Sequence, residues 1–368
     1  MKNKTKILIF LLLVFIMIIT SCSSNTVNNN TVNNNTEENN TVEDSEEYDA
    51  YIQTKYKIYG AGNVLLNYYE YEYEYQDYYR MTKSSYYSGN DELLNYYTYE
   101  FNEDGYQTKY SEYGPKDNLR RYYTYEYNEN GYQTKYTEYG PYDNALYYYT
   151  YDYNENCYQT KYSYYLGNGE LVNYYTYEYD ENGNPTKYST YDGNDYLLGY
   201  TTTEYDDRGY ASKYASYDGN GILLYYTKYE YNDRGYMKRY YYYEAKDNLQ
   251  YFYEYEYDDR GYMTKYLYYG PHENLRYYES YEYNENGYKE RMSIYGANDE
   301  LREYWEYSYN DKGYLNLIKN FDSTGNSKGY QEYKYNKKGY TQTYTSYDAS
   351  GEVQNSYEYV YKGYNYDY

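Results

Sequence analysis

The sequence predicts an all-β protein, an elongated array of antiparallel β-hairpins in which a 26-residue unit recurs about 12 times. Tyrosine supplies 87 of the 368 residues and alternates with polar residues between turn signals, as expected of half-buried strands. Most turns open with Asn or Asp and close with Gly, which is typical of hairpin connections. The turn glycines are separated by 26 residues or a multiple of it, and Cys157 fills the one missing position: Gly105, Gly131, Gly183, Gly209, Gly235, Gly261, Gly287, Gly313 and Gly339.

One hairpin illustrates the pattern. Residues 122–127 (YYTYEY) and 132–139 (YQTKYTEY) flank the turn Asn128–Gly131. If Tyr127 lies opposite Tyr132, one face carries Tyr123, Tyr125 and Tyr136, and the other carries Glu, Thr and Lys. We name these the tyrosine face and the ladder face. This register places Tyr122 and Tyr139 on the ladder face.

Counting both strands of every unit gives about 24 strands, whereas twisted open sheets rarely exceed about ten without curling. The sequence therefore predicts a coiled sheet or shell with its tyrosine face inward. The alternative is a β-solenoid with one 26-residue unit per coil.

The N-terminus predicts a lipoprotein signal peptide over residues 1–21. Three lysines precede Ile7–Ile19, an apolar run of 13 residues that is too short to span a bilayer as a helix. Ile19–Cys22 (ITSC) resembles a bacterial lipobox, and the resemblance implies cleavage before Cys22 and attachment of acyl chains such as palmitate to it. Residues 22–47 predict a lipidated cysteine followed by a disordered Asn/Thr/Glu-rich tether, and residues 48–368 the tyrosine-rich array.

The repeated unit resembles the YD, or RHS, repeat in segments such as Tyr177–Gly183 (YEYDENG). The resemblance extends over nearly all of Tyr51–Tyr361 and implies hairpins that spiral into a shell. A lipid anchor joined to a hairpin array also resembles single-layer outer-surface lipoproteins. A weaker similarity links the chain to aromatic cell-wall-binding repeats.

The chemistry of the chain argues against an enzyme. His272 is the only histidine, and the acidic residues recur with the repeat instead of forming one distinctive pair. We expect no catalytic residues, no metal site and no cofactor. The net charge of −24 makes nucleic acid an unfavourable partner.

These features predict a membrane-anchored protein of the cell envelope, at the outer membrane or cell surface. It would act as a non-catalytic repeat scaffold or adhesin-like protein that binds an extracellular protein. The alternative is a glycan- or cell-wall-binding module that uses repeated tyrosine platforms. The candidate platform residues are Tyr122, Tyr139, Tyr148, Tyr165, Tyr174 and Tyr191.

Overall fold

The computed structural model describes residues 50–75 and 79–364, all within the unit Tyr48–Tyr368. The predicted signal peptide, Cys22 and the tether lie outside the described residues. Within the described ranges, no helix has the length and apolar character needed to cross a membrane.

The described chain consists of 24 strands and three short 3₁₀ turns. In chain order they are β1 (Ala50–Tyr59), η1 (Ala61–Asn63), β2 (Leu65–Tyr75), β3 (Tyr79–Ser88), β4 (Leu93–Phe101), β5 (Gln107–Gly114), η2 (Pro115–Asp117), β6 (Asn118–Tyr127), β7 (Gln133–Tyr139), β8 (Ala145–Tyr153), β9 (Gln159–Leu166), β10 (Leu171–Tyr179), β11 (Pro185–Asp192), β12 (Leu197–Tyr205), β13 (Ala211–Asp218), β14 (Leu223–Tyr231), β15 (Met237–Glu244), β16 (Asn248–Tyr257), β17 (Met263–Tyr269), η3 (Pro271–Glu273), β18 (Leu275–Tyr283), β19 (Lys289–Gly296), β20 (Leu301–Tyr309), β21 (Leu315–Asp322), β22 (Ser327–Tyr335), β23 (Thr341–Tyr347) and β24 (Val353–Tyr364).

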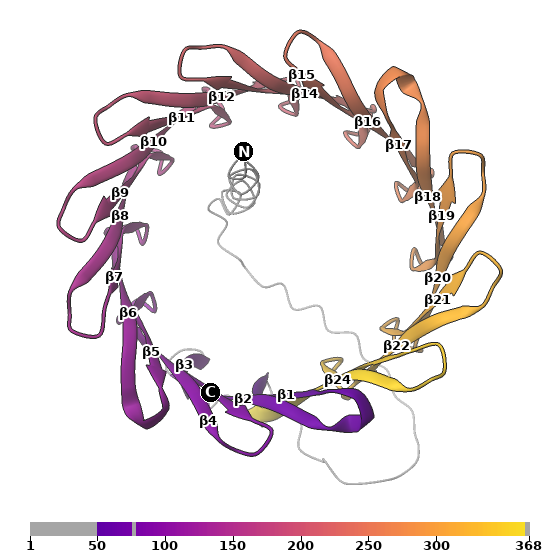
Figure 1. The fold of residues 1–368 in the computed structure, drawn as a ribbon, viewed down its shortest axis with the longest axis horizontal. Helices are drawn as coiled ribbons and strands as arrows, with labels where there is room; N and C mark the ends of the chain where they lie inside the picture. The colour runs from indigo at the N-terminus through magenta and orange to yellow at the C-terminus, as the bar shows by residue number, and fades with distance from the viewer. Residues whose placement is uncertain (1–49, 76–78, 365–368) are drawn as a thin grey trace, which may run out of the picture. The chain divides into compact units, whose positions relative to one another are not determined.

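Each strand pairs antiparallel with the strands before and after it, and β1 pairs antiparallel with β24, so the array closes into a ring (Figure 1). The hairpin array is therefore confirmed over the solenoid alternative, because its pairings are antiparallel. The prediction of an elongated array is corrected, since the first and last strands are neighbours. Closure leaves no unpaired strand edge among the 24 described strands, and such edges are the feature through which open sheets associate.

The ring has two different ends. Turns of the Asn128–Gly131 type connect the even-numbered strands from β4 to β22 to the strand that follows each, and define the first-turn end. Turns of the Gly114–Asn118 type connect each odd-numbered strand to the next and define the second-turn end. Because Ala50 pairs with Tyr364, the described chain begins and ends at the first-turn end.

The predicted register is wrong by two residues. Tyr127 pairs with Gln133, and Tyr125 lies opposite Tyr136. The cause is the turn: Tyr132 accepts a hydrogen bond from the Asn128 backbone N–H and remains outside the ladder, and the register then shifts between Glu126 and Tyr127. A shift of two residues keeps every side chain on its face, so the assignment of the two faces is unaffected.

The tyrosine face lines the inside of the ring. Burial, together with neighbouring tyrosines that include Tyr125 two strands away, raises the pKa of Tyr151 on β8 to about 12. Burial likewise raises the pKa of Tyr188 on β11, and Tyr214 on β13 contributes to the rise. Side chains two strands apart converge on the concave side of a curved sheet. The inward tyrosine face agrees with the sequence prediction.

Few apolar side chains are fully buried among the described residues, so the sheet has no ordinary aliphatic core. The most deeply buried positions are small residues on the ladder face, such as Ser111, which lies opposite Tyr122 of the next strand. Ser163 lies in the same way opposite Tyr174. A small residue here lets the tyrosine ring pack down on the backbone.

Candidate functional site

The six candidate platform residues come together as three pairs on the ladder face. Each pair joins the two strands of one hairpin, with parallel rings in contact. The ring centroids are 4.6 Å apart in Tyr122–Tyr139, 4.6 Å in Tyr148–Tyr165 and 4.8 Å in Tyr174–Tyr191. Tyr122 lies directly opposite Tyr139, a pairing that the incorrect register concealed. All six side chains are half-buried.

These pairs belong to a girdle around the ring. Eleven hairpins carry a stacked aromatic pair at this position, with centroids 4.3–4.8 Å apart and rings within 16° of parallel. At the seam between β24 and β1 the equivalent residues are Ser356 and Tyr59, which lie opposite each other without a second ring. The girdle is therefore interrupted only where the chain closes, as far as the described residues extend.

A lysine from the preceding strand lies over one ring of each candidate pair. The Nζ atoms of Lys109, Lys135 and Lys161 lie 4.9, 5.2 and 4.1 Å from the ring centroids of Tyr122, Tyr148 and Tyr174. Lys135 also forms an ion pair with Glu126 at 3.5 Å, directly across the hairpin. One face of such a ring contacts its partner, and the other faces an ammonium group. These contacts are favourable by about 0.5–1 kcal/mol at exposed sites.

Aspartates in the turns of the second-turn end accept hydrogen bonds from the hydroxyl groups of some girdle tyrosines. Tyr122 Oη donates to Asp143 Oδ1 at 2.9 Å, and five further tyrosines make the same contact. Burial and this hydrogen bond raise the pKa of Tyr122 to about 12. Asp143 has a positive φ of 60°, a conformation that Asp tolerates better than most residues.

Where another residue replaces the aspartate, the structure shows no such hydrogen bond from the tyrosine hydroxyl to the turn residue among the described residues. Gly169 occupies the position that would serve Tyr148, and Gly221 the position that would serve Tyr200. Glu273 stands where Phe252, which has no hydroxyl, takes the place of the tyrosine. The hydroxyl contact thus depends on the turn residue, since the tyrosine is kept at Tyr148 and Tyr200 although the aspartate is not.

A second set of tyrosines, which the sequence analysis overlooked, joins neighbouring hairpins at the first-turn end. Tyr106 follows the turn glycine of one hairpin, packs on Tyr127 with centroids 5.0 Å apart, and reaches the turn glycine of the next. A Cβ atom placed on Gly131 would lie 2.2 Å from Tyr106 Oη. The sequence feature that could have predicted these contacts is a tyrosine immediately after almost every turn glycine, at a position before the alternating residues of the next strand begin. Nine ring pairs follow this arrangement.

The exceptions to this arrangement are informative. Asn184 replaces the tyrosine after Gly183, and the next turn glycine, Gly209, has nothing within 4 Å of a built Cβ. Cys157, with φ 66°, replaces a turn glycine and forms no disulfide within the described residues. Close approach and positive φ together thus explain the recurring glycine.

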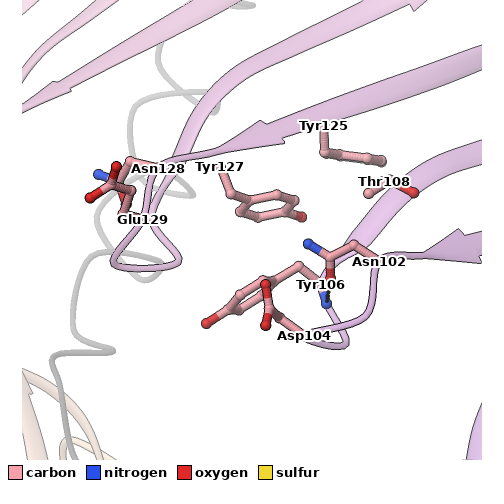
Figure 2. A pocket seen from close by; sticks show the side chains of 8 residues that line it. All are labelled: Asn102, Asp104, Tyr106, Thr108, Tyr125, Tyr127, Asn128 and Glu129. Carbon is pink, nitrogen blue, oxygen red and sulfur yellow. Dashed lines mark hydrogen bonds between the residues drawn. The ribbon is translucent and has the colours of Figure 1, made fainter.

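Two grooves lie between neighbouring turns of the first-turn end, and Figure 2 shows one of them. One groove runs between the turns at Asn102 and Asn128, and its lining includes Tyr106, Tyr127, Asp104 and Glu129.

His272 lies in η3 at the other end of the ring, with φ 62°. No group of three or more His, Cys, Asp or Glu side chains suited to a metal ion occurs among the described residues.

The chain matches no family model and no curated protein sequence. Among solved structures, it is similar to the crystal structure of TcdB2-TccC3-TEV, with a TM-score of 0.46, 10% identity, and coverage of 78% of this chain and 18% of that chain. It is also similar to a porin-like protein from Bacteroides uniformis, with a TM-score of 0.27, 12% identity, and coverage of 84% and 96%. The chain thus spans about a fifth of the length of the TcdB2-TccC3-TEV chain. Because both TM-scores are below 0.5, neither similarity bears on function.

Proposed function

We propose that this chain is a lipid-anchored protein of the bacterial cell envelope that acts as a non-catalytic scaffold and binds an extracellular protein. The observation that carries the proposal is the closed ring, in which the strands are paired all the way round and the repeat side chains contact one another. Such a ring is a rigid frame that repeats the same surface elements at regular intervals.

The sequence contributes the location. The lipobox-like segment Ile19–Cys22 would place acyl chains on Cys22, and the polar tether would hold the array clear of the headgroups. The net charge of −24 repels anionic lipid, so attachment would depend on the acyl chains. An outer-membrane or cell-surface position is part of the proposal.

Cell fractionation tests the anchor. We expect the natural chain in the membrane fraction, labelled by a palmitate analogue, and Cys22→Ser unlabelled and released. Protease added to intact cells should cleave the array, and binding to immobilised extracellular proteins should persist in soluble Cys22→Ser. An unlabelled natural chain contradicts the anchor, and an array protected on intact cells contradicts surface display.

A glycan- or cell-wall-binding module is the second candidate. The observation that favours it is the girdle, because half-exposed aromatic pairs recur around the ring and weak sites would add up by avidity. A sugar would have to displace a lysine such as Lys109 to reach a ring face. We expect Lys109→Ala to strengthen binding to purified cell wall and Tyr122→Leu to weaken it. Unchanged binding in both variants argues against this candidate.

A further inference from the structure

Two grooves at the first-turn end have the same architecture and different contents. The first lies between the turns at Asn102 and Asn128, and the second between the turns at Asn232 and Asp258. The first has a volume of about 620 Å³ and the second about 250 Å³. Comparing the side chains that line them shows which chemical group fits between two neighbouring turns.

In the second groove the chain supplies its own cation. Arg234, the third residue of its turn, donates from Nη1 to the carbonyl oxygen of Asp259 in the next turn at 2.6 Å. The same hydrogen bond from one turn to the next recurs between three other pairs of turns: Arg208 to Asn232 at 3.0 Å, Arg260 to Asn284 at 2.8 Å, and Lys312 to Lys337 at 2.9 Å. This position between turns thus accepts a guanidinium or ammonium group repeatedly.

Aromatic rings support the cation in two of these grooves. Arg208 Cζ lies 5.1 Å from the ring centroid of Tyr210, and Arg260 Cζ lies 5.0 Å from that of Tyr262. Each ring belongs to the tyrosine that follows the turn glycine. The cation in these two grooves therefore lies between a carbonyl oxygen of the next turn and a ring face, and it also donates to the carboxylate of Asp206 or Asp258 in its own turn.

Four consecutive turns in the first half of the ring lack the internal cation. Their third residues are Asp104, Asn130, Asn156 and Asn182. Their second residues are all acidic: Glu103, Glu129, Glu155 and Glu181. The turns that carry an arginine also have an acidic second residue, at Asp207, Asp233 and Asp259, so these four turns keep the acceptors and the negative charge and lack the cation.

The carbonyl acceptor in the first groove matches the one that arginine uses elsewhere, and the turn that precedes this groove begins with Asn102 as the turn of Arg234 begins with Asn232. The Asn128 carbonyl accepts the turn bond from the Gly131 N–H at 2.9 Å, as the Asn232 carbonyl does from Gly235 at 3.0 Å. A carbonyl oxygen has two lone pairs, and Arg208 uses the second one at Asn232. Tyr106 is 39% exposed, so its ring is accessible from the groove (Figure 2).

We propose that the grooves between the first turns of residues 102–209 bind lysine or arginine side chains of an extended basic polypeptide. The inference rests on the proposed role as an interaction scaffold and names the chemistry of its partner. Successive grooves are two strands apart, or roughly 10 Å. Three residues of an extended or polyproline II chain cover about 9–10 Å, so a cation at every third position matches consecutive grooves.

Binding of a labelled synthetic peptide tests the proposal on the full chain in detergent. The probe is a 12-residue peptide of about four Arg-Ser-Pro repeats, and its control has the same composition with the arginines contiguous. Fluorescence anisotropy should show the spaced peptide binding about tenfold more tightly, with an affinity that falls as salt is added. Equal affinity for both peptides would overturn the proposal that cations at every third residue enter consecutive grooves.

Substituted chains locate the site. Asp104, Asn130, Asn156 and Asn182 replaced by Arg would fill the grooves as Arg234 does, and should weaken peptide binding about tenfold or more. The charge-matched control carries arginine at four exposed positions of the second-turn end, Glu92, Asn194, Asn220 and Asn298, and should bind within about twofold of the natural chain. Equal loss in both chains would indicate unspecific charge attraction and overturn the proposal.

A converse variant opens filled grooves. Arg208→Asn, Arg234→Asn and Arg260→Asn together should raise the number of peptides bound per chain. An unchanged number would contradict the inference that these arginines occupy the same site as the peptide cations. These outcomes are separable from the proposed function. If the natural chain is displayed at the surface and binds protein but does not bind the peptide, only the proposal for the grooves is refuted. If Cys22 is not lipidated, only the proposed anchor is refuted.

Discussion

The contact between a tyrosine and the turn glycine of the next hairpin yields a quantitative prediction. Gly183 and Gly209 both have φ 84°, but Tyr158 Oη would lie 2.2 Å from a Cβ on Gly183, while nothing lies within 4 Å of one on Gly209. Alanine in this left-handed conformation costs about 1–2 kcal/mol. We therefore expect Gly209→Ala to lower the free energy of unfolding by about that amount.

Gly183→Ala should cost more, because the Tyr158 ring must move off Tyr179, on which it packs at 5.0 Å. Losing an aromatic contact adds about 0.5–1.5 kcal/mol, for a total of about 1.5–3.5 kcal/mol. Urea unfolding of residues 48–368, followed by circular dichroism, measures both variants. Tyr158→Asn reproduces the natural pairing of Asn184 with Gly209, so in that background Gly183→Ala should cost only about 1–2 kcal/mol.

Equal destabilisation by Gly183→Ala and Gly209→Ala would refute the reasoning, as would a double-mutant cycle with no coupling between positions 158 and 183.

Three further predictions concern the same repeats. Cys157→Gly should stabilise the chain by about 1 kcal/mol in urea unfolding, because glycine adopts φ 66° without strain, and Cys157→Ala should not stabilise it. Tyr122→Phe should lower the free energy of unfolding by about 1 kcal/mol through loss of the bond to Asp143, whereas Tyr148→Phe, for which Gly169 takes the place of the aspartate, should leave it almost unchanged; equal effects would contradict a role for the aspartate. Because the folded pKa of Tyr122 is raised to about 12, above the unfolded value of about 10, its stabilising contribution is complete below pH 10 and is lost as the pH rises from about 10 to 12. Absorbance of tyrosinate should therefore rise mainly above pH 10 and together with unfolding, and early titration of the folded chain would contradict it.

The sequence predicted the hairpins and their two faces because period and alternation depend only on neighbouring residues. It did not predict the register, because Tyr132 is excluded from the ladder by turn geometry that its spacing does not reveal. For the same reason Tyr122 and Tyr139 were placed on one face but not recognised as a stacked pair. Closure through β1 and β24 depends on curvature summed over all strands, which no single repeat encodes.

The pairing of Ala50 with Tyr364 makes the position of the chain ends arbitrary with respect to the ring. Every hairpin, including the first and last, has a hairpin on both sides, so no unit serves as a terminus. New ends cut at another first turn, with the old ends joined, would give a circular permutant containing the same 24 strand pairings. The predicted tether could thus be joined to any hairpin around the circle, and the ring could be turned to present any sector without altering its fold.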